Sequence, residues 1–149
     1  MTIESRVLAF TTLPVFERGG GVQTMLFSNK ELGAHITSGV TRFPVGGSIP
    51  LHYHNCDEQT TVLEGEAEAE IDGRRVRMRP YDTAVIPQGR HHRFHNVGTG
   101  PMMILWVYNI TDVTRTFVET GETVPHLSPR DLAASRLPAG PSDRPERRA

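Results

Sequence analysis

The chain has 149 residues, which is about the length of one domain of common size, so a second domain with its own core is not expected. The apolar fraction is 37% and the charged fraction 22%; both are ordinary globular values and argue against disorder throughout. The formal net charge is −1, so no basic field favours nucleic acid, and we expect no nucleic-acid partner. A single cysteine, Cys56, excludes a disulfide scaffold.

No segment has the pattern of a membrane span or of a secretory signal. The longest apolar run covers residues 102–107, far short of the roughly 20 residues that cross a bilayer. The first six residues carry charge where a signal peptide needs an apolar run. We therefore expect a cytoplasmic protein that does not enter a membrane.

Short strand-like segments separated by glycine- and proline-containing turns fill the middle of the chain. They span residues 23–28, 35–43, 51–53, 58–63, 66–71, 74–79, 83–86, 92–96 and 102–110. Many short strands at this spacing predict an all-β domain, either a sandwich or a closed barrel.

The clearest local signal is a β-hairpin around Asp72-Gly73, a pair that fits a type I′ turn. The turn predicts a register with opposite charges on one face and apolar side chains on the other, and a slip of one residue would invert both faces. The predicted pairs are Glu70 with Arg75, Glu68 with Arg77, Glu66 with Arg79, Ala69 with Val76 and Ala67 with Met78. We interpret the charged face as a solvated sheet surface.

A short helix is predicted near the C-terminus. Ser128 is suited to cap it, Pro129 fits its first position and Asp131 lies in its first turn. We expect it to end near residue 136. The following residues 138–149 are rich in proline and arginine and have no large apolar side chain, so they predict a mobile or partner-held tail.

Four side chains with metal-binding chemistry lie in and beside these strands. His52 and His54 are two residues apart, so on a strand both imidazoles face the same side. Glu58 follows four residues later, and His92 begins another strand-like segment. Imidazole nitrogens and carboxylate oxygens suit a divalent transition metal, which would also neutralise a buried glutamate.

The spacing around these residues resembles the two signature motifs of the cupin superfamily, over residues 38–111. The first motif matches at Gly46, His52, His54, Glu58 and Gly65, and the second at Asp82, Pro87, Gly89, His92 and Asn96. Tyr81 replaces the usual opening glycine of the second motif. The resemblance implies a small antiparallel β-barrel or double-stranded β-helix, a jelly roll, in which His52, His54, Glu58 and His92 hold one metal ion. Iron, manganese, nickel, copper and zinc all remain open.

Strand alternation predicts which neighbours of these ligands face the interior. From Glu58 it places Thr60 and Val62 inside, and from His92 it places Phe94 inside. It directs His91, Arg93 and His95 outward, where we expect His91 and His95 to meet solvent. We interpret His35 and His126 as surface residues, Cys56 as a small buried side chain, and Trp106 and Tyr108 as core filling.

The function expected from these features is a metal-dependent enzyme acting on a small oxygen-containing organic substrate. Two open positions on a six-coordinate metal would accept water, substrate oxygens or dioxygen. The resemblance favours a dioxygenase-like oxidoreductase, with Glu58 also able to accept a proton. The alternatives are a non-redox isomerase, epimerase, lyase or polyketide-type cyclase, and a non-catalytic barrel that binds a small ligand.

We also expect a homodimer. Small barrels of this kind pair through sheet edges, which need cover. The N-terminal arm, residues 1–22, is strand-like over residues 2–16 and suited to extend a neighbour's sheet.

Overall fold

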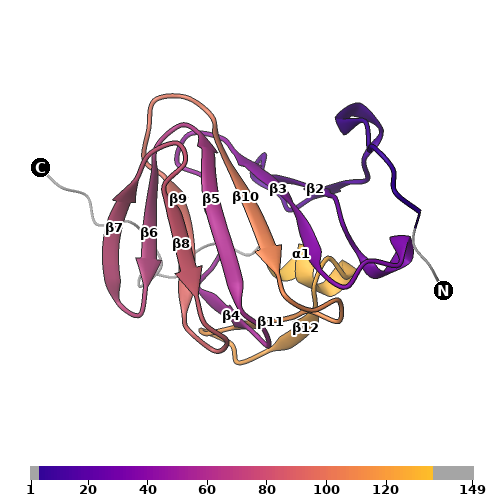
Figure 1. Cartoon of the computed structure of the whole chain (residues 1–149). Coiled ribbons are helices and arrows are strands. Elements are labelled where there is room, and N and C mark those ends of the chain that lie inside the picture. The colour runs from indigo at the N-terminus through magenta and orange to yellow at the C-terminus, as the bar shows by residue number, and fades with distance from the viewer. Residues whose placement is uncertain (1–3, 136–149) are drawn as a thin grey trace, which may run out of the picture.

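The computed structural model describes residues 4–135, and two antiparallel sheets of six strands form its body (Figure 1). The first sheet has the order β1 (Val15–Glu17), β2 (Gln23–Leu26), β3 (Thr37–Phe43), β10 (Met102–Tyr108), β5 (Glu58–Glu64) and β8 (Thr83–Ile86). The second has the order β12 (Thr123–Pro125), β11 (Thr114–Phe117), β4 (His52–His54), β9 (His92–Asn96), β6 (Ala67–Ile71) and β7 (Arg74–Met78). Two 3₁₀ turns, Phe10–Thr12 and Lys30–Leu32, and one helix, α1 (Pro129–Ser135), complete the described elements.

The jelly-roll form of the predicted fold is confirmed. Within residues 4–135 the strand ladders join neighbours inside each sheet and do not connect the two sheets, so the strands do not close into one barrel. Both sheets contribute to one core, with Val62 and Ile104 from the first and Ala69 and Phe94 from the second. The metal-binding candidates lie between the sheets because β4, β5 and β9 border this core.

Alternation along the strands sets which side chains reach the core. In β10 every second residue is buried, from Met102 to Tyr108, and in β5 Thr60 and Val62 are fully buried. The predicted inward positions Thr60, Val62 and Phe94 are therefore confirmed. A strand with one buried and one partly exposed face produces this period of two.

All nine predicted strands are present, and five of them are shorter than predicted by one or two residues. Two others, β11 and β12, were not predicted, and β1 overlaps only the end of the arm predicted to be strand-like over residues 2–16. Each has only three or four residues, too few to show a clear alternation. The strand predicted over residues 2–16 is confirmed only at Val15 and Phe16, which pair with β2 of the same chain. It is wrong over residues 4–14, and Pro14 just before β1 has no N–H to donate.

The register predicted for the β6–β7 hairpin is confirmed for the pairs that lie in the strands. Glu70 lies opposite Arg75 and Glu68 opposite Arg77. Asp72 and Gly73 have φ of 51° and 80°, as a type I′ turn requires. The predicted pair of Glu66 with Arg79 lies outside the ladder.

The charged face of this hairpin is less solvated than predicted. Arg93 on the neighbouring strand β9 is 2% exposed and donates Nε–H to Glu70 at 2.8 Å. His95, predicted to be exposed, is also buried. The prediction for His95 was wrong, because β9 is an inner strand and the side chains of β6 lie beside its outward residues. The prediction of a solvated charged face holds for Arg77 and Glu66, which are exposed.

The predicted C-terminal helix is confirmed as α1, and the Ser128 hydroxyl accepts a hydrogen bond from the Asp131 N–H at 3.2 Å. The predicted helix end near residue 136 and the predicted tail, residues 138–149, lie outside the described residues. Within the described residues, no helix combines the length and apolar character needed to cross a membrane.

Candidate metal centre

Three buried histidines meet between the sheets. His52 and His54 lie on β4, and His52 is paired directly opposite His92 on β9. One ring nitrogen from each of the three lies within 4.8 Å of those of the other two. The sheet register therefore brings together three of the four side chains that the sequence selected, although 38 positions separate His54 from His92.

The backbone fixes the orientation of each imidazole. In each of these three histidines, Nδ1 lies at hydrogen-bond distance from a main-chain carbonyl oxygen, which can only accept a hydrogen bond. Each Nδ1 therefore carries the hydrogen, and Nε2 keeps the lone pair that binds metals. The contacts are His52 to Pro50 at 2.7 Å, His54 to Thr114 at 2.9 Å and His92 to Arg90 at 2.9 Å.

Glu58 is placed at the same point by β5. Its Oε1 lies 3.2 Å from Nε2 of His54 and 3.1 Å from Nε2 of His92. Its Oε2 accepts a hydrogen bond from the Thr60 hydroxyl at 2.5 Å. Burial acts to raise the pKa of Glu58, but the charge and hydrogen bonds that His92 and His54 supply when they carry a proton hold it well below its usual range, so the carboxylate is ionised.

The donor set fits a divalent cation. Burial lowers the pKa of His52 and His54, and the charge of Arg115 adds to the effect, so both rings are neutral. Neutral Nε2 atoms and an ionised carboxylate are all electron-pair donors, and at about 3 Å from one another they repel unless a cation lies among them. Nitrogen and oxygen donors of this kind suit first-row transition metals.

His52 and Glu58 border a small interior cavity of about 30 Å³, room for roughly one water molecule. Trp106 and Tyr108 line it, so these side chains do more than fill the core as predicted. The Tyr108 hydroxyl lies 3.3 Å from Nε2 of His54, within hydrogen-bond distance. The remaining lining residues are Arg18, Thr41, Phe43, Ile49, His52, Glu58, Phe94, Ile104, Arg115 and His126.

His126 is a cavity residue that the sequence did not indicate. It follows β12, and its ring lies edge-on to Trp106 and Tyr108 at centroid distances of 5.1 and 5.2 Å. Burial, with the charges of Arg115 and Arg18, holds the pKa of His126 well below its usual range. The prediction of a surface histidine was wrong because β12 was not predicted, and no spacing linked position 126 to the motifs.

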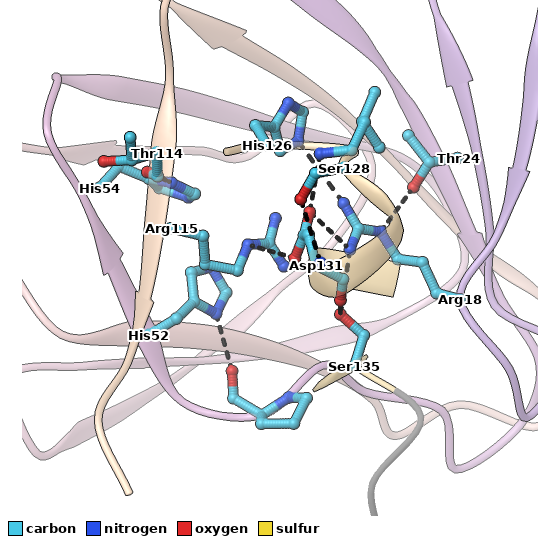
Figure 2. A network of polar contacts seen from close by, with 12 residues as sticks. Arg18, Thr24, His52, His54, Thr114, Arg115, His126, Ser128, Asp131 and Ser135 are labelled. Atoms are coloured by element: carbon cyan, nitrogen blue, oxygen red, sulfur yellow. Dashed lines mark hydrogen bonds and ion pairs between the residues drawn. The ribbon is translucent and has the colours of Figure 1, made fainter. Parts of the chain in front are cut away.

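A buried ionic cluster lies beside α1 (Figure 2), and its two arginines, Arg18 and Arg115, line the cavity. Arg18 Nη1 lies 3.3 Å from Asp131 Oδ2, and Arg115 Nε lies 3.5 Å from Asp131 Oδ1. All three side chains are at most 3% exposed. Arg18 follows β1, Arg115 lies on β11 and Asp131 lies on α1, so three distant parts of the chain meet here.

The other residues near the ligands are placed as follows. Cys56 is buried as predicted. Its burial and, to a smaller extent, the charges of the nearby carboxylates raise the pKa of its thiol to about 12. Tyr53 lies between His52 and His54 in sequence but stacks on the exposed His91, with ring centroids 5.2 Å apart. His35 is exposed, as predicted.

Comparison with known proteins identifies the family. A family model described as a cupin domain matches residues 39–108. The polyketide synthase CurC of Streptomyces cyaneus is 30% identical over 138 residues, which cover 90% of this chain and 87% of that protein. The chain belongs to the cupin superfamily.

Solved cupin structures share the fold. The polyketide cyclase RemF of Streptomyces resistomycificus has a TM-score of 0.62 and 20% identity, covering 70% of this cupin and 79% of that chain. An oxalate oxidase structure has a TM-score of 0.61 and 24% identity, covering 67% of this cupin and 56% of that chain. The same architecture is thus found in enzymes with different named activities.

Two motif residues of this cupin have structural roles. Tyr81, in place of the usual glycine, adopts φ of 76°, so the turn is kept in spite of the substitution. Nδ2 of Asn96 contacts the carbonyl oxygens of Phe43, Pro44 and Gly100 at 3.1, 3.0 and 2.9 Å. Asn96 in this way ties the end of β9 to the turns that precede β4 and β10.

Proposed function

We propose that this cupin is a metal-dependent enzyme that closes a ring in a polyketide-type substrate, a chain of ketones separated by methylene carbons. The observation that carries the proposal is the convergence of three buried imidazoles and an ionised carboxylate beside an interior cavity. The similarity to CurC over 87% of that protein's length supports the substrate class. RemF supports it through the shared fold.

In this proposal His52, His54 and His92 hold one divalent ion and Glu58 completes the ligand set. The donor atoms suit iron, manganese, nickel, copper and zinc alike. When bound, such an ion supplies Lewis acidity toward a carbonyl oxygen of the substrate. The three backbone carbonyls behind the imidazoles keep the Nε2 atoms directed at that point.

The protein groups then move protons and exclude water. We assign Glu58 as the proton acceptor from a methylene carbon, because it is ionised and buried beside the cavity. The carbon that loses its proton forms a bond to the carbonyl carbon of a second ketone, whose oxygen takes up the proton. Loss of water then gives the unsaturated ring, so no oxidant is consumed. Tyr108, whose hydroxyl faces the site, is placed to hydrogen-bond a substrate oxygen.

The experiment is reconstitution with a minimal polyketide synthase that releases an unreduced poly-β-ketone chain. We expect the metal-loaded cupin to change the distribution of ring-closed products equally well in air and under strictly anaerobic conditions. Turnover that needs oxygen, with matching uptake at an oxygen electrode, would contradict the cyclase and support the dioxygenase expected from the sequence. A folded, metal-loaded protein that binds the ketone chain and never converts it would instead be a binding module.

Variants of the site make this experiment specific. Glu58→Gln keeps the size of the side chain but removes the proton acceptor, so product formation should be lost. His91→Ala removes an exposed histidine next to a ligand and should leave the product distribution unchanged. Loss of activity in both variants would show that the assay reports general damage to the fold, and the role of Glu58 would then fail.

We also propose that the protein forms a homodimer through a sheet edge. The outer strands β8 and β7 expose Val85 and Val76, which are 73% and 57% exposed. Apolar side chains on open edges favour pairing with a second copy. Sedimentation at micromolar concentration should show a dimer, and a monomer alone would refute it.

A further inference from the structure

The buried ionic cluster beside the cavity contains more positive than negative charge. Arg18 and Arg115 both line the cavity, while Asp131 is the one carboxylate that contacts them among residues 4–135. Burial together with the charge of Arg115 lowers the pKa of Arg18 to about 10, as expected when two guanidinium groups are crowded together.

Arg115 has N–H groups that find no hydrogen-bond partner in the described part of the chain. Its side chain is 3% exposed, yet Nε and Nη1 have no hydrogen-bond partner in the described part of the chain. Asp131 Oδ1, at 3.5 Å from Nε, also lacks a hydrogen bond there. A buried guanidinium with open N–H groups is costly. Its planar fork fits the two oxygens of a carboxylate.

We propose that Arg115 is a specificity-determining residue that binds a carboxylate group of the substrate, and that Asp131 takes that place as an internal counterion while the substrate is absent. The inference rests on the proposed function for the location of the substrate, and it adds that the substrate is a keto acid. Arg18 supplies the second positive charge.

The position of α1 is consistent with a substrate carboxylate replacing Asp131 beside Arg115. The cavity is about 30 Å³, too small for a keto acid of several carbons, so a substrate must displace part of its wall. Asp131 belongs to α1, whose Ala134 packs with Phe117 and Val124 in a small cluster that is separate from the main core. Asp131 contacts Arg18 and Arg115, which line the cavity, so moving α1 would free these two side chains and leave the core between the sheets intact.

The test compares a keto acid with its neutral ester. The ligands are acetoacetate and methyl acetoacetate, and the signal is the fluorescence of Trp106, the single tryptophan, which lines the cavity. Calorimetry provides a second measurement. Both are made on the full chain, with metal and after chelation, so binding is measured independently of turnover.

We expect the wild type to bind acetoacetate about tenfold or more tightly than the ester. Arg115→Gln should abolish this preference, and Arg115→Lys should keep part of it. The matched control Arg77→Gln, at an arginine with a 63% exposed side chain, should keep all of it. Equal affinity for acid and ester, no binding of acetoacetate by the wild type, or an unchanged preference in Arg115→Gln would each overturn the proposal.

Asp131→Asn keeps the proposal testable if Arg115→Gln does not fold. Removing the internal counterion should tighten acetoacetate binding about threefold or more, and equal or weaker binding would overturn the proposal. The outcome is separable from that of the ring-closure experiment. If the protein prefers the acid through Arg115 but closes no ring, the proposed cyclase function fails and the role of Arg115 stands. If it closes rings but binds acid and ester equally well, the role of Arg115 fails and the cyclase function stands.

Discussion

His91 and His92 are adjacent in sequence, but their side chains lie on opposite faces of one sheet. His92 lies at the start of β9 with its ring among His52, His54 and Glu58. His91 is exposed and stacks on Tyr53. The two histidines can therefore be compared directly, because His92 lies in the candidate metal site and His91 does not.

The first prediction uses this pair. His92→Ala should lower affinity for a divalent metal by about tenfold or more, because it removes one of three imidazole donors. His91→Ala should bind metal like the wild type, near one ion per chain. Elemental analysis after dialysis against a competing chelator measures both. Equal retention of metal by the two variants would contradict the assignment of His92 as a metal ligand.

The second prediction concerns Tyr81, a non-glycine residue at φ of 76°. This conformation costs an L-residue about 1 kcal/mol, while glycine adopts it freely but loses more entropy on folding. Since Tyr81 is 79% exposed and has little packing to lose, Tyr81→Gly should raise the free energy of unfolding slightly, by about 0.5 kcal/mol. Tyr81→Ala keeps the strained backbone and should not stabilise. Urea unfolding of both variants is the measurement, and a gain in the alanine variant would be inconsistent with backbone strain.

The third prediction is a pH dependence of stability. Burial acts to raise the pKa of Asp131, but the charges of Arg115 and Arg18 hold it below its usual range. Because the pKa is lower in the folded state, the stabilisation is full above the unfolded value of about 4 and is lost as the pH falls below it.

Asp131→Asn should therefore lower the free energy of unfolding by about 3 kcal/mol at pH 7. The gap between this variant and the wild type should narrow as the pH falls toward about 3. Urea unfolding of metal-free protein at a series of pH values measures both curves. A gap that stays constant down to pH 3 would count against an ionised Asp131.

The fourth prediction separates two charge pairs on the hairpin. Arg77 contacts Glu66 at 3.4 Å, and these side chains are 63% and 52% exposed. Exchanging the two residues should change the free energy of unfolding by less than about 1 kcal/mol. Exchanging Arg77 with Glu68 instead places a second arginine beside Arg75, which contacts Glu68 at 3.4 Å, and should cost more. Thermal unfolding of the two double variants ranks them, and the reverse order would contradict the observed ion pairs.

Local patterns in the sequence determined most of the sheet structure and the candidate metal-binding residues. The alternation in β5 and β10 follows from one buried face, and the Asp72-Gly73 turn sets the hairpin register. The spacing of His52, His54 and Glu58 places them near a single reversal of the chain. His92 was reached through the resemblance to a second motif.

The tertiary structure alone decided the rest of the site. Arg18 and Asp131 are 113 positions apart, and Arg115 and His126 lie in or beside strands too short to be read from alternation. Nothing local marks such residues, because each is ordinary in its own segment. They acquire a shared chemistry when sheet pairing and the packing of α1 bury them around one cavity, where removal from water makes their charges interact strongly.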